Sequence, residues 1–238
     1  MPADPGVDRA PLKRPFIEYC LEPNGALLAV LLALMATYPF AGTVPGMGLL
    51  IQVLSLAMTA IAILACWNDR WIFYAAIVLG PASELLVSTG QIGSAAAIGT
   101  WGQGGRLVFI LLLITSYTKG ILKSPRVTMN TVFAASSVYL LMALSWGYVF
   151  SLMHHIDPEA FRGIVTAAAD TSGLSADGQL FYFSLITLTT VGFGDIVPLS
   201  PAARVFAALE GLIGQLFLAI IIARLVGLEI ANRIRQHD

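Results

Sequence analysis

Apolar residues gather in long runs along this chain, and the length of each run predicts what it forms. A hydrocarbon core about 30 Å thick needs about 20 apolar residues in helical form. Runs near that length cover approximately 25–41, 47–67, 71–88, 105–117, 129–153 and 202–228. Because lipid offers no hydrogen-bond partner to an exposed peptide group, these runs are predicted to be membrane-spanning helices. The third run contains Pro81 and Glu84, and the fourth is short.

A further apolar stretch, 179–190, has only 12 residues and is too short to cross a membrane. Ser175 or Asp177 could cap it as a helix. It is followed by glycines and not by a charged flank, which predicts a helix that enters the membrane and returns. Irregular backbone at that depth is tolerated only beside protein or water, so the next residues should line a pore or cavity. The predicted fold is an all-α membrane protein with six transmembrane helices and this re-entrant element between the fifth and sixth.

Composition agrees with the apolar runs and removes several classes of protein. Hydrophobic residues make up 57% of the chain and charged residues 11%, with a mean hydropathy of +0.81. A soluble domain has about 45–50% apolar and about 25% charged residues. A soluble enzyme, a disordered chain and a nucleic-acid binder are therefore excluded. The two cysteines, Cys20 and Cys66, do not form a disulfide framework and leave the redox compartment open.

The basic residues are distributed unequally between the two sides that these spans define. Ten of the 13 fall on the side that holds both chain ends, and the others are Arg106, Arg162 and Arg204. The positive-inside rule makes the richer side cytoplasmic, so both termini are expected there, in the plasma (cell inner) membrane. A cleavable signal peptide is the alternative for the first span. The long, proline-rich segment before it, which contains acids, disfavours that alternative.

The chain is expected to divide into three parts, with Pro125 marking the main boundary. These parts are a cytoplasmic tail (1–24), a four-helix membrane domain (25–126) and a pore domain (127–238). The uncharged, glycine-rich stretch 88–105 predicts an outer loop. No fused nucleotide or calcium module is expected after the sixth helix.

The four-helix domain occupies the position of a voltage sensor without carrying the charges of one. A sensor needs several cations at every third position. The fourth span offers Arg106 at its outer end and Lys119 at its inner end, with apolar and uncharged polar residues between them. Steep voltage dependence is therefore not expected. Glu84 and Arg106 could form a structural ion pair, or Glu84 could sense protons.

Residues 189–195 read TTVGFGD and resemble the potassium channel signature TTVGYGD, with Phe in place of Tyr. The resemblance extends over about 130–230 and implies an outer helix, a pore helix, a selectivity filter and an inner helix. In this family, main-chain carbonyls replace the hydration shell of K⁺. The ion-binding residues implied are Thr190, Val191, Gly192, Phe193 and Gly194, with K⁺ itself held at the first four.

Local chemistry supports this assignment of the filter. Successive carbonyls alternate sides in an ordinary strand, but Gly192 and Gly194 permit positive φ, which lets neighbouring carbonyls face the same way. Thr190 would add a hydroxyl oxygen at the inner end. Val191 and Phe193 are expected to point away from the axis and brace the backbone against the pore helix.

Several other residues are expected to support the filter. Thr189 and Asp195 flank it, and Tyr182 and Phe183 stand where family members often carry a Trp pair. Ile186 takes the place at which some bacterial channels have a Glu paired with the filter Asp.

Two residues of the sixth span are candidates for support and gating. An acid at membrane depth needs a partner, so Glu210 is expected to receive hydrogen bonds from behind the filter. Gly214 lies where many family members have a hinge glycine. It could instead allow close helix packing, together with Gly211.

The predicted outer mouth has more acids than bases, which would concentrate cations there unless the loop is merely solvated. The acids are Asp157, Glu159, Asp170, Asp177 and Asp195, against Arg162 and Arg204. His154 and His155 could bind zinc or sense pH, although adjacent loop histidines are a weak metal signal.

The resemblance to potassium channels therefore implies a homotetrameric, potassium-selective channel that conducts K⁺ passively and is not an enzyme. Its partners would be K⁺ and membrane lipid, with no cofactor and no nucleic acid. The alternatives are a non-selective cation channel and a non-conducting membrane sensor or scaffold with a pore-like fold. A transporter is disfavoured because the first half shows no second broken-helix segment.

Overall fold

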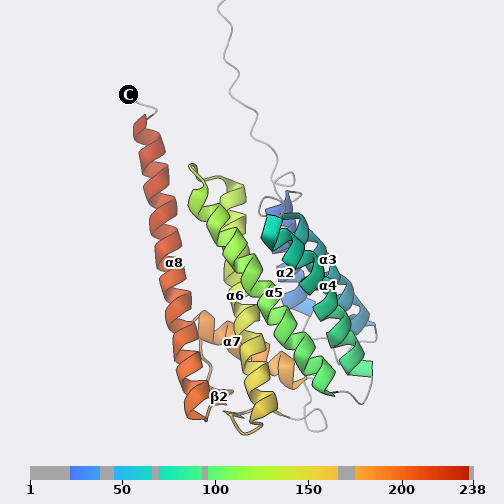
Figure 1. Ribbon diagram of the computed structural model, residues 1–238. Helices are drawn as coiled ribbons and strands as arrows, with labels where there is room; N and C mark the ends of the chain where they lie inside the picture. Colours follow the sequence, from blue (N-terminus) through green and yellow to red (C-terminus); the bar gives the residue numbers. More distant parts are fainter. Residues whose placement is uncertain (1–21, 38–45, 66–69, 93–95, 166–174, 236–238) are drawn as a thin grey trace, which may run out of the picture.

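The computed structural model describes residues 22–37, 46–65, 70–92, 96–165 and 175–235. These residues form an almost entirely helical protein (Figure 1). The helices are α2 (Pro23–Thr37), α3 (Met47–Ala65), α4 (Arg70–Ile92), α5 (Ala96–Lys123), α6 (Met129–Ile156), α7 (Ala176–Leu188) and α8 (Pro201–Arg235). Two short strands, β1 (Phe161–Arg162) and β2 (Val197–Pro198), pair antiparallel on either side of α7 in the chain.

Five of the described helices, α3, α4, α5, α6 and α8, are long and apolar enough to cross a membrane. Helix α2 is apolar but has 15 residues. The first predicted span runs beyond α2 into residues outside those described, so the sixth crossing stays a prediction. The all-helical membrane architecture agrees with the sequence pattern.

The predicted outer loop at 88–105 is wrong, because most of that stretch is helical. Helix α4 continues to Ile92 and α5 begins at Ala96. A Cβ atom on Gly102 would lie 2.7 Å from the backbone nitrogen of Val87, so this glycine permits close packing of α5 on α4. Gly102 thus serves helix contact, as small residues do in membrane bundles, and does not break the helix.

Helices α2 to α5 pack beside α6, and α8 lies on the other side of the molecule (Figure 1). The short helix α7 lies between α6 and α8 and contacts both. One apolar core joins the four-helix group to α6 through fully buried side chains such as Leu31, Leu113 and Leu141. Helix α6 is therefore packed against the four-helix group through a shared core.

The turn between α5 and α6 ends in a well-formed helix cap. The Thr128 hydroxyl accepts a hydrogen bond from the Thr131 backbone N–H at 3.3 Å, and the Thr131 hydroxyl accepts one from the Thr128 N–H. This reciprocal arrangement satisfies backbone donors that would be unpaired at a helix start. It fixes where α6 begins after Pro125.

Candidate functional site

Helix α7 is the short element that sequence reasoning expected to enter the membrane without crossing it. Its 13 residues span about 20 Å at 1.5 Å per residue. Ser175 caps its start, with the hydroxyl accepting a hydrogen bond from the Gly178 N–H at 3.2 Å. Asp177 instead lies in the first turn, where a negative charge interacts favourably with the helix dipole. The helix ends at Leu188, and its C-cap residue Thr189 comes immediately before the glycine-bearing segment.

The segment after α7 has positive φ at every second residue. The values are +60° at Thr190, +50° at Gly192 and +80° at Gly194. The two glycines adopt the conformation expected from their lack of a Cβ atom. Because the residues between them keep the ordinary sign of φ, the usual alternation of carbonyl directions in a strand is broken. Successive main-chain oxygens can then face one side.

The inner end of this segment, residues 190–194, is held by the last turns of α7. The backbone N–H groups of Val191 and Gly192 both donate to the carbonyl oxygen of Ile186, at 2.9 and 3.1 Å. The Thr190 N–H donates to the Thr187 carbonyl at 3.0 Å. These bonds place the segment directly against the carboxyl end of the helix.

Val191 and Phe193 do not brace the backbone against α7 within one chain, as sequence reasoning expected. Their side chains are 53% and 72% exposed. Both are apolar and project from a segment whose backbone is also exposed. One chain therefore supplies a single open strand and leaves its large side chains uncovered.

The outer end of the segment is held by Asp195. Its carboxylate accepts a hydrogen bond from the Tyr182 hydroxyl at 2.9 Å. Burial of the phenol and this hydrogen bond both raise the pKa of Tyr182 above its ordinary value, so the hydroxyl stays a donor near neutral pH. Tyr182 thus anchors the Asp195 carboxylate, which the apolar side chain of Ile186 cannot do.

Gly163 also supports this outer end and was missed by sequence reasoning. Its φ is +96°, and a Cβ atom there would lie 2.0 Å from the Asp195 carbonyl oxygen. The adjacent strands β1 and β2 pair Arg162 with Val197. The loop after α6 therefore packs directly on the backbone at Asp195, which no local motif in the sequence indicates.

An aromatic cluster lies behind α7. Phe183 is buried, with its ring centroid 5.1 Å from that of Phe150 and 5.5 Å from that of Phe161. Phe150 also stacks on Trp146 at 6.0 Å. Aromatic contacts of these edge-on and stacked kinds stabilise a core by more than the burial of their apolar area alone. Phe183 therefore anchors α7, whereas its neighbour Tyr182 reaches the outer end of the segment.

Glu210 lies fully buried on α8 and faces α7, as expected. The Ser184 hydroxyl of α7 donates to its carboxyl oxygen at 2.5 Å. The same Ser184 oxygen lies 2.7 Å from the Ala143 carbonyl of α6. In addition, the Tyr139 hydroxyl of α6 donates to the Leu188 carbonyl at 3.0 Å. These contacts tie three helices together behind the glycine segment.

Gly214 permits a close approach of α8 to α7. A Cβ atom there would lie 2.6 Å from the Leu188 side chain and 3.0 Å from its carbonyl oxygen. Helix α8 is continuous through this position. The contact supplies the packing role that was the alternative to a hinge, and the hinge stays a prediction.

The acidic residues of the expected outer mouth do not all gather in one place. Asp177 accepts hydrogen bonds from Gln103 at 2.9 Å and from Ser151, and so faces α5 and α6. Asp170 lies outside the described residues. Within the described part of the chain, no group of three or more metal-ligating side chains includes His154 or His155.

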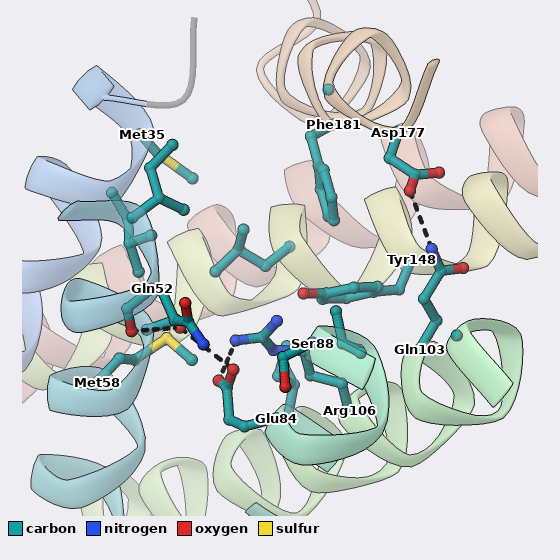
Figure 2. Close-up of a pocket in the computed structure, with 18 of the residues that line it drawn as sticks. Met35, Gln52, Met58, Glu84, Ser88, Gln103, Arg106, Tyr148, Asp177 and Phe181 are labelled. Carbon is teal, nitrogen blue, oxygen red and sulfur yellow. Dashed lines mark hydrogen bonds and ion pairs between the residues drawn. The ribbon is translucent and has the colours of Figure 1, made fainter. Parts of the chain in front are cut away.

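A cavity of about 490 Å³ separates the four-helix group from α7 (Figure 2). At its base Glu84 of α4 forms an ion pair with Arg106 of α5, which confirms the expected structural bridge. The Ser55 hydroxyl also donates to Glu84, at 3.2 Å. The Arg106 guanidinium lies 5.9 Å from the centre of the Tyr148 ring. Two opposite charges are therefore held together at membrane depth by partners on several helices.

Comparison with known proteins finds matches to the second half of this chain. Residues 128–228 match the family model described as an ion channel. The potassium voltage-gated channel protein shk-1 of Caenorhabditis elegans is 52% identical over 40 residues, which are 17% of this chain and 8% of that protein. The two pore potassium channel c of Oryza sativa subsp. japonica is 35% identical over 89 residues, or 37% of this chain and 18% of that protein. The matched parts thus cover less than a fifth of each relative. These matches confirm the resemblance to the potassium channel family.

Proposed function

We propose that four copies of this chain form a potassium-selective channel, in which residues 190–194 of each copy face one shared axis. The observation that carries this proposal is the positive φ at Thr190, Gly192 and Gly194. It turns consecutive carbonyl oxygens toward one side, where they replace water around a dehydrated ion. The relatives whose names describe potassium channels support the choice of ion.

The homotetramer follows from what one chain leaves incomplete. A single strand offers oxygens on one side of an ion only, and Val191 and Phe193 are 53% and 72% exposed. Closed cyclic symmetry is the usual arrangement of identical subunits. Neighbouring copies would complete the ring of oxygens and cover these side chains. Asp195, Tyr182, Phe183 and Glu210 would then hold the strand in register.

The proposed channel conducts passively, with both chain ends in the cytoplasm, and has weak voltage dependence. In α5, Arg106 and Lys119 lie at the two ends of the apolar stretch, and no charged side chain lies between them. Arg106 is already paired with Glu84 and so adds little charge that is free to move. Steep voltage dependence requires several gating charges in each subunit. Gly214 remains the proposed hinge for opening at the cytoplasmic end.

The proposal is tested by recording purified protein in vesicles with potassium on one side and sodium on the other. Potassium selectivity predicts a reversal potential close to that of potassium and little dependence on voltage. A reversal potential near zero would favour the non-selective cation channel. Absence of current, with tetramers present by light scattering, would favour the non-conducting scaffold.

Tyr182→Phe is expected to shorten the time that the filter stays conductive, because it removes the hydrogen bond to Asp195. One such bond contributes about 1 kcal/mol, so the conducting fraction should shift about fivefold. Single-channel open times check this. Tyr74→Phe is the matched control, because Tyr74 lies on α4 and is 63% exposed. Equal open times in the two variants would exclude a role for the Tyr182 hydroxyl.

A further inference from the structure

The cavity between the four-helix group and α7 is separate from the proposed conduction path. Its volume of about 490 Å³ is in the range of sites for small organic molecules, and none of residues 190–194 lines it. Much of its wall is apolar, with Leu34 and Met35 on α2, Met58 on α3 and Leu185 on α7. These walls favour a ligand with a hydrophobic body.

The charged side chains of this lining leave one acid without a basic partner. Glu84 and Arg106 form an ion pair with each other. Asp177 also lines the cavity, and within the described part of the chain its carboxylate is bonded by the uncharged side chains of Gln103 and Ser151. A carboxylate has about four lone-pair positions, so Asp177 is able to accept further hydrogen bonds. The lining therefore favours a positively charged group.

Aromatic side chains in the lining also favour a cation. Phe181 points from α7 toward Tyr148 of α6 (Figure 2), and their ring centroids lie 4.8 Å apart in an edge-on arrangement. The face of an aromatic ring attracts positive charge, and the Arg106 guanidinium already lies 5.9 Å from the centre of the Tyr148 ring. His155 lines the cavity as well, but its Nδ1 bonds to a backbone carbonyl oxygen of its own helix at 2.7 Å.

We propose that this cavity binds an organic ammonium ion, whose ammonium group donates to Asp177 and whose apolar body lies against the side chains of α2 and α3. An ammonium group has three donors, which suit the remaining acceptor positions of the carboxylate. A metal ion would lack ligands, since no three metal-ligating side chains gather among the described residues. An organic anion would be repelled by the Asp177 charge.

A ligand in this cavity contacts the helix that precedes the proposed filter. Tyr182 lies on α7 after Asp177, lines the cavity, and donates a hydrogen bond to the Asp195 carboxylate at 2.9 Å. Binding therefore holds α7 in the position in which this hydrogen bond forms, and single-channel open times should lengthen. This consequence rests on the proposed channel function, whereas the binding site itself does not.

The binding site is tested on full-length protein in detergent with three probes that share one apolar body: phenylbutylammonium, phenylbutanol and phenylbutanoate. Equilibrium dialysis against detergent without protein measures the affinity of each probe. The ammonium is expected to bind about tenfold more tightly than the alcohol, because hydrogen bonds between charged groups are stronger than neutral ones. The proposal would be overturned if the alcohol or phenylbutanoate bound as tightly as phenylbutylammonium.

Asp177→Asn removes the charge and keeps the shape of the side chain, so the preference for phenylbutylammonium over phenylbutanol should disappear. Glu159→Gln is the matched control, because Glu159 is an exposed acid just beyond the end of α6 and does not line the cavity. It should keep the preference of wild type. Loss of the preference in both variants, or in neither, would overturn the assignment to Asp177. A melting curve without ligand shows whether Asp177→Asn is folded, and the three probes on wild type do not depend on that variant.

Single-channel recordings in planar bilayers test the effect on conduction. Phenylbutylammonium is expected to lengthen the open times of wild type and to leave those of Asp177→Asn unchanged. Equal effects on the two proteins would show that the probe acts elsewhere, such as in the pore, and would overturn the link through Tyr182. If neither protein conducts in the absence of the probe, the proposed channel function fails, while the dialysis measurements still test the cavity.

Discussion

Gly192→Asp is expected to abolish potassium flux in reconstituted vesicles. Gly192 has a φ of +50°, in the left-handed region that residues with a Cβ atom adopt only at a cost of about 1–2 kcal/mol. In a tetramer this cost applies four times to one ring. Four carboxylates would also lie beside the permeating ion. They would change its electrostatic environment and repel one another within the ring. Flux below the detection limit, with tetramers intact by light scattering, is the expected result.

Two further variants separate backbone conformation from added charge. Gly192→Ala keeps the charge of the wild type and introduces only the Cβ atom, so partial loss of flux is expected. Gly104→Ala on α5 is the control, because a Cβ atom there meets nothing within 4 Å and its φ is not positive. Its flux should equal that of wild type. Wild-type flux in Gly192→Asp would contradict the proposal that this segment lines the conduction path.

The backbone conformation of the proposed filter, residues 190–194, could be anticipated from sequence because it depends on glycines, which few other conformations require. Gly192 and Gly194 mark positive φ, and both adopt it. The same sign at Thr190 was not anticipated, since threonine rarely adopts it. Its conformation follows from the hydrogen bonds that α7 makes to the next two residues, which belong to the fold and not to the local sequence.

The errors in predicting the fold come from residues whose role depends on a distant neighbour. A glycine in an uncharged stretch predicts a loop, but Gly102 allows α5 to approach Val87 of α4. Gly163 likewise makes room for the backbone at Asp195. From a single sequence, a glycine that forms a turn cannot be distinguished from a glycine that allows another segment to pack closely against it. Buried pairs such as Glu84 with Arg106 are easier to predict, because a charge at membrane depth needs a partner.

Glu210→Ala is expected to destabilise the assembly by about 3 kcal/mol per chain, from a lost hydrogen bond and an unfilled cavity. Glu210 is fully buried, and its carboxyl group accepts a hydrogen bond from the Ser184 hydroxyl at 2.5 Å. Because α7 meets α8 at this contact, its loss should also loosen the proposed filter, which follows α7 directly. The midpoint of denaturant unfolding in detergent and the potassium flux in vesicles measure the two effects.

Glu210→Gln distinguishes a hydrogen-bonding role from a requirement for the carboxyl group itself. A glutamine has nearly the same shape and can donate its amide N–H to the Ser184 oxygen, while the Ser184 hydroxyl donates to the Ala143 carbonyl at 2.7 Å. Most of the stability and flux should therefore return in this variant. Glu229→Ala, an exposed acid on the same helix, is the control and should change stability by less than about 0.5 kcal/mol. If Glu210→Ala is as stable as Glu229→Ala, the contact between α7 and α8 does not depend on this residue. The proposed filter must then be held by the aromatic cluster around Phe183 and by the packing of Gly214 on Leu188.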